Sequence, residues 1–376
     1  RIGIIANEFF DARLNRVGWF GWAARNAAEA IRGDARFDDP VFLSGERITA
    51  TVDEIDGLKL MNFPGSRWDA YRTLRQARPD CFLLVDFRPS YLRWLRSAPF
   101  TPAIVWVRDP RTSETMKRLR SLTVPGASDA PGAAIDGDVR AHDRDVTRAL
   151  RPRRTVAIAN KMAYMRSMIP DVFGMSDQGI ILPNPDILPV GYRPAPKSAR
   201  PQVCFVARLD PVKRPWLFVE LARRMPEVDF VMMGAAFVGS GTPWLDRDPP
   251  DNLRMLGNVG GVEKLDLIAS SWVLVNTAIH DESAVSNLEA LACGTPLVSY
   301  IESDELASRF GTCLGYSFGD GLDSLPRLEA AVRSFLDDPA RASEIGARGR
   351  DWCLGEHSTS NFREALVSIC ENMGVS

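Results

Sequence analysis

Short apolar runs alternate with longer amphipathic stretches along most of the chain. In the first half, uninterrupted apolar runs predict buried strands at residues 2–6, 82–85, 103–107 and 156–158. Between them, apolar residues recur at intervals of three and four and predict helices, for example at 20–31 and 68–77. This alternation is typical of an open parallel sheet covered by helices.

A proline-rich segment interrupts the pattern near the middle of the chain. Residues 183–201 hold six prolines, a density that neither a helix nor a central strand tolerates. We therefore predict a first domain over 1–185, a linker over 186–200 and a second domain over 201–355. We expect the last segment, 356–376, to be a helix that packs back on the first domain.

The alternation restarts after the linker. Predicted strands lie at 203–206, 228–233, 253–256, 273–276 and 296–299, and predicted helices at 216–224, 262–269, 284–292 and beyond 325. Two similar halves predict an α/β protein with two doubly wound parallel-sheet domains, Rossmann-like, facing across a cleft. Ligands of such sheets bind outside the carboxyl ends of the strands. The Gly- and Pro-rich stretch 124–138 predicts a loop, either a surface insertion or one that closes over a substrate.

Composition excludes several classes of protein. Of 376 residues, 45% are hydrophobic and 25% charged, which is globular composition. The net charge of −2 argues against a nucleic-acid binder, although it permits a local basic patch for a phosphorylated substrate or an anionic lipid. The six scattered cysteines show no metal-binding spacing, and no apolar run has the length of a membrane helix. We expect a cytoplasmic protein, with a peripheral position at the inner membrane face as an option.

Two stretches of the second half carry candidate chemistry. In FVARLDPVKRP (205–215), Arg208 and Lys213 flank a turn after a predicted strand, where two cations can neutralise a diphosphate. Solvated surface charge is the other interpretation of this pair.

In IHDESAVSNLEALACGTPLVS (279–299), acidic residues open a helix. Glu282 and Glu289 share a face if that helix already includes residue 282; otherwise the amides of Ser283, Ala284, Val285 and Ser286 are free donors suited to a phosphate. Simple capping of the helix by Asp281 and Glu282 is the alternative.

The fixed order of these stretches resembles the retaining nucleotide-sugar glycosyltransferases of family 4, which have the GT-B fold. The resemblance is carried by Arg208 and Lys213, by LRMLGNV (253–259) and by DESAVSNLEALACGTPLVS (281–299); before the linker it rests on RVGWFGWAAR (16–25) and ILPNP (181–185). It implies that Arg208 and Lys213 bind the donor diphosphate and that Glu289 binds the ribose hydroxyls. It also implies a backbone approach to the phosphates at Gly18.

Some positions depart from the family pattern. Asp281 stands where the family normally has Glu, and neighbouring Glu282 is the other candidate for contact with the donor sugar. Trp19 replaces a second glycine after Gly18. Arg108 and Asp109 stand where a His-Asp pair is common, and we interpret His280 as a structural neighbour of the site.

The charge demands of the reaction suggest a mechanism. Breaking a nucleotide-sugar bond releases an anionic diphosphate, which Arg208, Lys213 and the helix amides near Val285 would stabilise. The Asp-x-Asp sequences within 143–146 and at 246–248 lack the strand context of a metal site. We therefore expect metal-independent transfer, with no cofactor beyond a UDP- or GDP-type sugar donor and with a small-molecule, glycan or lipid-linked acceptor. A sugar-nucleotide epimerase or phosphorylase on the same fold, and an inactive nucleotide-binding module, are the competing hypotheses.

Overall fold

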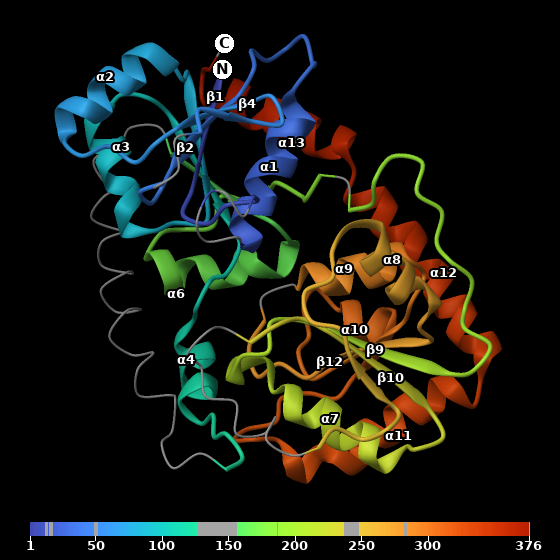
Figure 1. Cartoon of the computed structure of the whole chain (residues 1–376). Coiled ribbons are helices and arrows are strands. Elements are labelled where there is room, and N and C mark those ends of the chain that lie inside the picture. Colours follow the sequence, from blue (N-terminus) through green and yellow to red (C-terminus); the bar gives the residue numbers. More distant parts are fainter. Residues whose placement is uncertain are drawn as a thin grey trace. The chain divides into compact units, whose positions relative to one another are not determined.

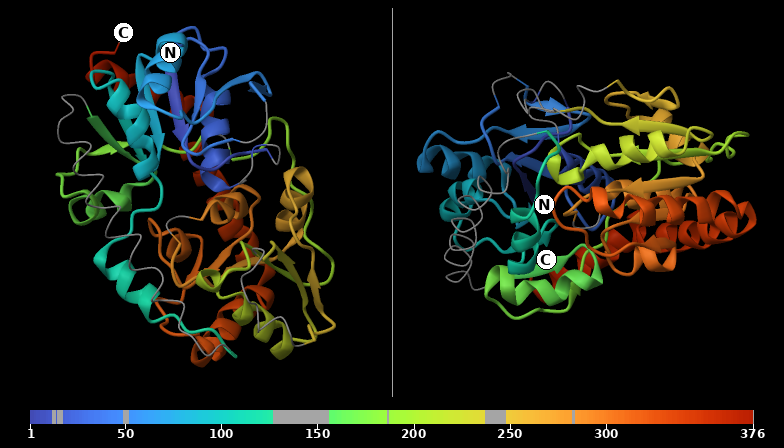
Figure 2. Two further views of the ribbon diagram at one scale, coloured as in Figure 1. Left: turned by 60° about the vertical axis from the view of Figure 1, so that its left-hand side comes forward. Right: turned by 90° about the horizontal axis from the view of Figure 1, so that it is seen from below.

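The chain forms two α/β units, each with its own sheet (Figure 1). The computed structural model describes residues 1–11, 14, 18–48, 52–126, 156–185, 187–236, 248–281 and 284–375. Of these, unit 1 comprises the residues up to 110, those from 156 to 185 and those from 357 onward. Unit 2 comprises the described residues of 111–126 and 187–356. Both ends of the chain therefore belong to unit 1 (Figure 2).

Unit 1 is built on an eight-stranded sheet in the order β3-β4-β2-β1-β5-β6-β7-β8. Its strands pair in parallel, except that β3 and β4 form a short antiparallel pair at one edge. The strands are β1 (Ile2–Ala6), β2 (Val41–Ser44), β3 (Glu54–Ile55), β4 (Leu58–Met61), β5 (Cys81–Val85), β6 (Ala103–Val107), β7 (Val156–Asn160) and β8 (Ile180–Ile181).

Successive residues of the unit 1 strands enter two separate hydrophobic cores, one on each face of the sheet. Ile4 belongs to the core shared with α1 and α13, whereas Ile5 belongs to the core shared with α2 and α3. Helices therefore cover both faces, as Figure 1 shows. The helical segments are α1 (Trp19–Ile31), α2 (Arg67–Ala77), α3 (Leu92–Ser97), α6 (Ile169–Phe173), α13 (Thr359–Asn372) and short 3-10 turns at Pro89–Tyr91 and Ala163–Met168.

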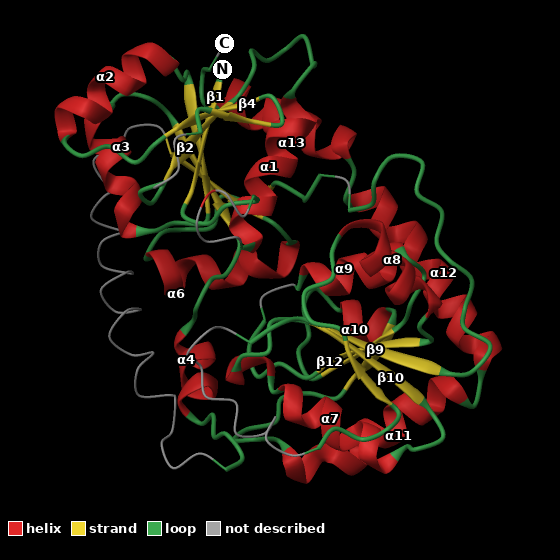
Figure 3. Cartoon of the chain, viewed as in Figure 1, coloured by secondary structure: helices red, strands yellow, loops and turns green. Residues whose placement is uncertain are grey.

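Unit 2 has a six-stranded sheet in the order β11-β10-β9-β12-β13-β14, and all its described pairs are parallel (Figure 3). Its strands are β9 (Gln202–Val206), β10 (Asp229–Met233), β11 (Leu253–Met255), β12 (Val273–Asn276), β13 (Leu297–Ser299) and β14 (Gly311–Cys313). Its helices are α4 (Ser113–Arg120), α7 (Pro215–Arg224), α8 (Gly261–Ser270), α9 (Val285–Ala292), α10 (Leu306–Arg309), α11 (Leu325–Leu336) and α12 (Pro339–Glu356), with 3-10 turns at Pro211–Lys213 and Leu322–Ser324.

The predicted first domain, 1–185, differs from unit 1 at the segment that contains α4. This segment belongs to unit 2, because Arg118 is buried with its guanidinium carbon 3.7 Å from the centre of the Tyr316 ring. In addition, Ser121 Oγ accepts a hydrogen bond from the Gly319 amide at 3.4 Å. Most of the predicted loop, 127–138, lies outside the described residues.

The predicted linker is fastened to unit 2. Its residues from 187 to 200 lie in neither helix nor strand, as the prolines require, but Lys197 Nζ donates to the Ser271 carbonyl at 2.6 Å and to Thr295 Oγ1 at 2.9 Å. The indole of Trp272 donates to the Ser198 carbonyl at 3.0 Å. These contacts make the linker part of the second unit, and the chain passes between the units at residues 185–187.

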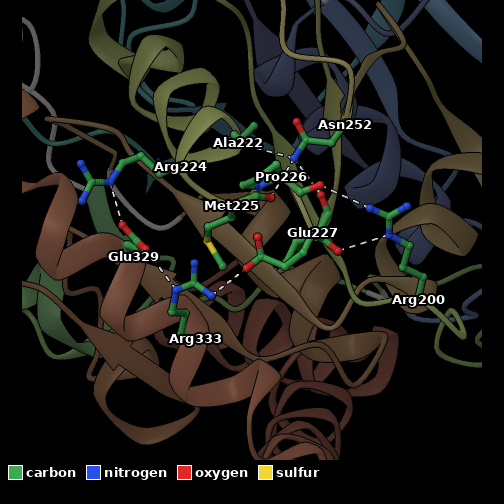
Figure 4. A network of polar contacts seen from close by, with 10 residues as sticks. Arg200, Ala222, Arg224, Met225, Pro226, Glu227, Asn252, Glu329 and Arg333 are labelled. Atoms are coloured by element: carbon green, nitrogen blue, oxygen red, sulfur yellow. Dashed lines mark hydrogen bonds and ion pairs between the residues drawn. The ribbon is translucent and has the colours of Figure 1, made fainter.

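A polar network closes the end of unit 2 at which β10 begins (Figure 4). Asn252 Nδ2 donates to the carbonyls of Ala222, Met225 and Val228, and so holds the turn between α7 and β10. On α11, Glu329 accepts from Arg224 and Arg333. The turn and α11 are therefore fixed at the end of β10 opposite the loops that follow the strands.

Candidate functional site

Two loops of unit 2 meet at the carboxyl ends of its central strands. One follows β9 and leads to α7; the other follows β12 and leads to α9. Because β9 and β12 are parallel neighbours, both loops leave the sheet at the same edge. The Ile279 amide donates to the Val212 carbonyl at 2.9 Å, and Thr277 Oγ1 donates to the Lys213 carbonyl at 2.6 Å. The two loops are thus joined along their backbones.

Arg214 completes this junction. Its backbone is left-handed, with a φ of 45°, and its buried guanidinium donates to the carbonyls of Thr277 at 2.8 Å and Ser317 at 3.0 Å. Burial lowers the pKa of Arg214 to about 10. We did not predict this residue. The only signal in the sequence is the position of this arginine between Lys213 and the proline that begins α7. Such a position is consistent with a structural cation that fixes the two loops.

The cation and the anion predicted from different stretches form an ion pair. Lys213 Nζ lies 2.7 Å from Asp281 Oδ2, and the two side chains are 14% and 16% exposed. Asn276, the last residue of β12, places its Nδ2 at 3.5 Å from the same carboxylate oxygen. Asn276 was not predicted either, although a polar residue that ends a buried strand at the carboxyl edge is a recognisable signal.

Arg208 is the more accessible of the two predicted cations. Its side chain is 42% exposed and its Nη2 lies 3.0 Å from Asp210 Oδ2 on the same loop. The structure therefore brings Lys213 together with Asp281 and pairs Arg208 with Asp210, which is not among the predicted site residues. His280 is buried beside Asp281.

Glu289 faces a lysine on the neighbouring helix. Its Oε1 lies 2.6 Å from Lys264 Nζ on α8, and its Oε2 is buried with no hydrogen-bond partner among the described residues. The side chain of Glu289 is 9% exposed. Lys264 was not predicted, because a lysine on an amphipathic helix is usually a solvated residue.

The helix that carries Glu289 begins after residue 282, whereas one of the two interpretations of this stretch required residue 282 to be part of it. α9 starts at Val285, with Ala284 as its N-cap and no side-chain cap, so Asp281 precedes it. The argument that Glu282 and Glu289 share a helical face therefore does not apply. Ser286, in the first turn, is buried. Glu282 and Ser283 themselves lie outside the described residues.

Gly18, predicted to bind donor phosphate, lies against a carboxylate in unit 1. Gly18 is the N-cap of α1, and a Cβ added there would come within 2.2 Å of Glu8 Oε2. The same oxygen accepts from the Phe20 amide at 3.0 Å. The Phe20 amide at the start of α1 thus has the Glu8 side chain as its acceptor. The glycine is explained by the close approach of Glu8.

Arg108, which stands where the family often has a His-Asp pair, is held by contacts inside unit 1. Arg108 is buried, its guanidinium carbon lies 4.4 Å from the centre of the Trp106 ring, and its Nη1 donates to Asn184 Oδ1. Burial lowers the pKa of Arg108 to about 9. Within the described part of the chain, no three His, Cys, Asp or Glu side chains form a group suited to a metal ion.

Comparison with known proteins finds a family model that matches part of the chain, most of it in unit 2. Residues 213–368 match the family model described as glycosyl transferase-like. Over 224 residues the chain is 29% identical to D-inositol 3-phosphate glycosyltransferase of Kineococcus radiotolerans, with 51% of each protein covered. The chain spans about half the length of the curated relatives it matches. The matched family segment includes Lys213, Asp281 and Glu289 but neither Arg208 nor Gly18.

Similarity in structure extends over the whole chain. Sucrose-phosphate synthase of Thermosynechococcus elongatus superposes with a TM-score of 0.71 at 13% identity, covering 99% of this chain and 98% of that one. Anabaena HepE in complex with UDP-glucose gives 0.70 at 11% identity, covering 98% and 99%. The fold is therefore of the GT-B type, and the predicted pair of parallel-sheet α/β domains is confirmed.

Proposed function

We propose that this protein is a retaining glycosyltransferase that moves a sugar from a nucleoside diphosphate to an acceptor hydroxyl. The observation that carries the proposal is the meeting of Lys213 and Asp281, 2.7 Å apart, at the carboxyl ends of β9 and β12. This edge of a parallel sheet is the usual position for a nucleotide ligand. The family match and the UDP-glucose complex of Anabaena HepE support a nucleotide-sugar donor.

The roles of the residues follow from their charge and placement. Lys213 and Arg208 bind the diphosphate and stabilise its charge as the bond to the sugar breaks. Asp281, with Glu282, accepts hydrogen bonds from sugar hydroxyls, and Glu289 accepts them from the ribose. The amides at the start of α9, from Ala284 to Ser286, donate to the diphosphate, and we assign the same role to the amide of Ser283, which lies outside the described residues. The acceptor oxygen bonds to the anomeric carbon as the diphosphate leaves, and the acceptor proton passes to the departing oxygen.

We further propose that transfer needs no metal ion. The leaving group is neutralised by Arg208 and Lys213, and the carboxylates of Asp281 and Glu289 each have a lysine partner, at 2.7 Å and 2.6 Å. A carboxylate that is engaged in this way is a poor ligand for a divalent ion. Turnover should therefore persist in excess EDTA. Loss of turnover in EDTA and its recovery on addition of Mn²⁺ would contradict this part of the proposal.

The experiment that tests the activity is donor-dependent release of the nucleoside diphosphate. The chain is incubated with UDP-sugars and GDP-sugars, with and without candidate acceptors, and the free nucleotide is measured. We expect release with one base and one sugar, increased by the acceptor. The anomeric configuration of the product, read by NMR, distinguishes retention from inversion. Binding of UDP or GDP without any turnover would identify a nucleotide-binding module instead.

We also propose a cytoplasmic site of action, because nucleotide sugars are charged metabolites and five of the six cysteines are buried free thiols. No helix in the described ranges is long and apolar enough to cross a membrane. Cell fractionation tests this part of the proposal.

A further inference from the structure

The outer face of α2 in unit 1 carries aromatic and cationic side chains that the glycosyl-transfer proposal does not use. Ala70, Leu74 and Ala77 form the buried side of this helix. On the opposite side, Trp68 is 76% exposed and Tyr71 is also exposed, with their ring centres 6.2 Å apart. A large aromatic residue that is mostly in water on a helix is unusual, because burial of such a ring is strongly favourable.

Arginines surround these rings. Arg72 and Arg75 lie on the same exposed side of α2, and the Arg75 guanidinium carbon is 6.0 Å from the centre of the Tyr71 ring. The only acidic residue of α2, Asp69, is bound by Arg72 at 2.5 Å. Arg72 therefore neutralises the single negative charge of α2.

The face continues onto the end of α3. Ser97 Oγ donates to the Arg67 carbonyl at 3.4 Å, and Arg67 Nη2 donates to the Arg96 carbonyl at 3.5 Å. These contacts place the end of α3 beside the start of α2, and the two helices lie side by side in Figure 1. Phe100, three residues after Ser97, is 95% exposed. We call the outer side of α2 the aromatic–arginine face; it consists of Arg67, Trp68, Tyr71, Arg72 and Arg75, and the exposed Phe100 follows the end of α3 that lies beside it.

The charge of this region is opposite to that of the whole protein. Residues 67–100 contain seven arginines and three aspartates, whereas the whole chain has a net charge of −2. One of the three aspartates, Asp86, is buried. On the aromatic–arginine face itself the three arginines outnumber the single aspartate of α2, so this face is cationic and attracts an extended anionic surface.

We propose that the aromatic–arginine face binds the surface of an anionic phospholipid bilayer. Trp68 and Phe100 would enter the headgroup region, where amphipathic and aromatic side chains are favoured, and the arginines would contact lipid phosphates. Arginine suits phosphate because its planar guanidinium donates two hydrogen bonds at once. A bilayer fits better than a nucleic acid, since exposed apolar rings gain free energy from lipid. The inference does not depend on glycosyltransferase activity.

The test is sedimentation of the full chain with vesicles of two compositions. Vesicles of phosphatidylcholine mixed with phosphatidylglycerol should bind the protein, and vesicles of phosphatidylcholine alone should bind it much less. Raising the salt from about 0.1 M to about 1 M should release it, because the Debye length falls from about 10 Å to about 3 Å. Equal binding to both kinds of vesicle, or no binding to either, would overturn the proposal.

Matched variants assign the binding to this face. The double variant R72Q/R75Q should lower the partition coefficient about tenfold or more. R341Q/R348Q, which removes the same charge from exposed positions on α12 of unit 2, should leave it unchanged. In the same way, W68S/F100S should weaken binding, whereas Val262→Ser on the exposed side of α8 should not. Circular dichroism and thermal unfolding verify that each variant is folded. If both arginine double variants behave alike, the aromatic–arginine face is not the docking surface.

Discussion

At the scale of single residues, the candidate site consists of ion pairs that a ligand would have to share. Lys213 is bound to Asp281 and Arg208 to Asp210, so each cation already has an anionic partner. A diphosphate carries more charge than one carboxylate and can compete for the same cations. The unliganded pairs would then hold the side chains near their working positions, which limits the conformational freedom lost on binding.

The first prediction concerns these two cations. Arg208→Ala and Lys213→Ala should each remove about 2 to 4 kcal/mol of transition-state stabilisation, as loss of one oxyanion donor does. Steady-state kinetics of nucleotide release measures kcat/KM for each variant. Arg208→Ala should leave the free energy of unfolding nearly unchanged, because an exposed ion pair contributes little. Kinetics like those of the wild type in the double variant would remove the diphosphate role.

The second prediction concerns Glu289. If it accepts hydrogen bonds from ribose hydroxyls, Glu289→Gln should weaken binding of the intact nucleotide by about tenfold or more. A 2′,3′-dideoxy nucleotide should bind the variant and the wild type equally, because the interaction is already missing. Calorimetric titration measures all four affinities. Undiminished affinity of the wild type for the dideoxy nucleotide would show that Glu289 acts elsewhere, for example only as the partner of Lys264.

Sequence reasoning identified residues whose chemistry is visible in their type, and it missed those that act through position. Lys213 and Asp281 were predicted from different stretches and lie together. Arg214 and Lys264 were not predicted, because a buried guanidinium or a paired lysine looks like any surface residue in a linear sequence. Asn276 was missed although it is a polar residue at the end of a buried strand. Gly18 was assigned to a phosphate, and the residue against it is Glu8, ten positions earlier. Nothing in the local spacing indicates that contact.

At the scale of elements, the position of α9 depends on how closely α12 packs against it. A Cβ added at Gly346 on α12 would come within 2.2 Å of the carbonyl oxygen of Gly294, which follows α9. The atoms that this Cβ would meet belong to the backbone of Gly294, so the clash cannot be relieved by rotating a side chain. The small residue is therefore a condition for this helix contact.

The third prediction compares two glycines of the same helix. Gly346→Ala should lower the free energy of unfolding by about 1 to 3 kcal/mol, because α12 must move away from α9. Gly355→Ala, near the end of α12, meets no described atom within 4 Å and should be neutral or stabilising by up to about 1 kcal/mol, as alanine favours helix. Urea unfolding of both variants provides the comparison. Equal stabilities would mean that the α9–α12 contact adapts without strain.

Most of the main strands and helices were predictable because their apolar periodicity is strong. The predicted strand at 103–107 has the bounds of β6, and the predicted helix at 20–31 differs from α1 by one residue. The short edge strands β3 and β8, with two residues each, have no periodicity to detect. The membership of α4 in unit 2 could not be predicted either, since it depends on the contact of Arg118 with Tyr316, almost two hundred residues away.

At the scale of the whole molecule, a buried histidine makes stability depend on pH. His357 is the first residue of the chain after it returns to unit 1, and its Nδ1 accepts from the Asn184 amide at 3.2 Å. Burial, reinforced by Lys161 and Arg108, lowers the pKa of His357 to about 3. In the unfolded chain the pKa is about 6.5. Between these values only the unfolded state takes up the proton, so acid favours unfolding.

The fourth prediction follows from this difference. As the pH falls from 7 to 5, His357 should remove about 2 kcal/mol of stability, at about 1.4 kcal/mol per pH unit below 6.5. His357→Gln keeps an acceptor for the Asn184 amide but has no proton to gain. Its free energy of unfolding should therefore fall less than that of the wild type over the same range. Parallel urea titrations at the two pH values measure this, and identical pH dependences would contradict the assignment.

The architecture of two parallel-sheet domains was predictable because the βα alternation stops at a cluster of prolines and then restarts. The exact membership of each unit was not, because it depends on tertiary contacts. Residues 187–200 are bound to unit 2 through Lys197 and Ser198, and no local signal distinguishes such a segment from a free linker.

The discontinuity of unit 1 has a consequence for how the protein is made. Phe362 of α13 packs against Trp106 of β6 with ring centres 5.6 Å apart, so one face of the first sheet is completed by the last helix. At a ribosomal rate of about 5 to 20 residues per second, roughly ten to thirty-five seconds separate the synthesis of β8 from that of α13. During that time the sheet of unit 1 exposes apolar surface, while the chain from β9 to α12 of unit 2 is being synthesised. We therefore expect the nascent chain to recruit chaperones until α13 has emerged.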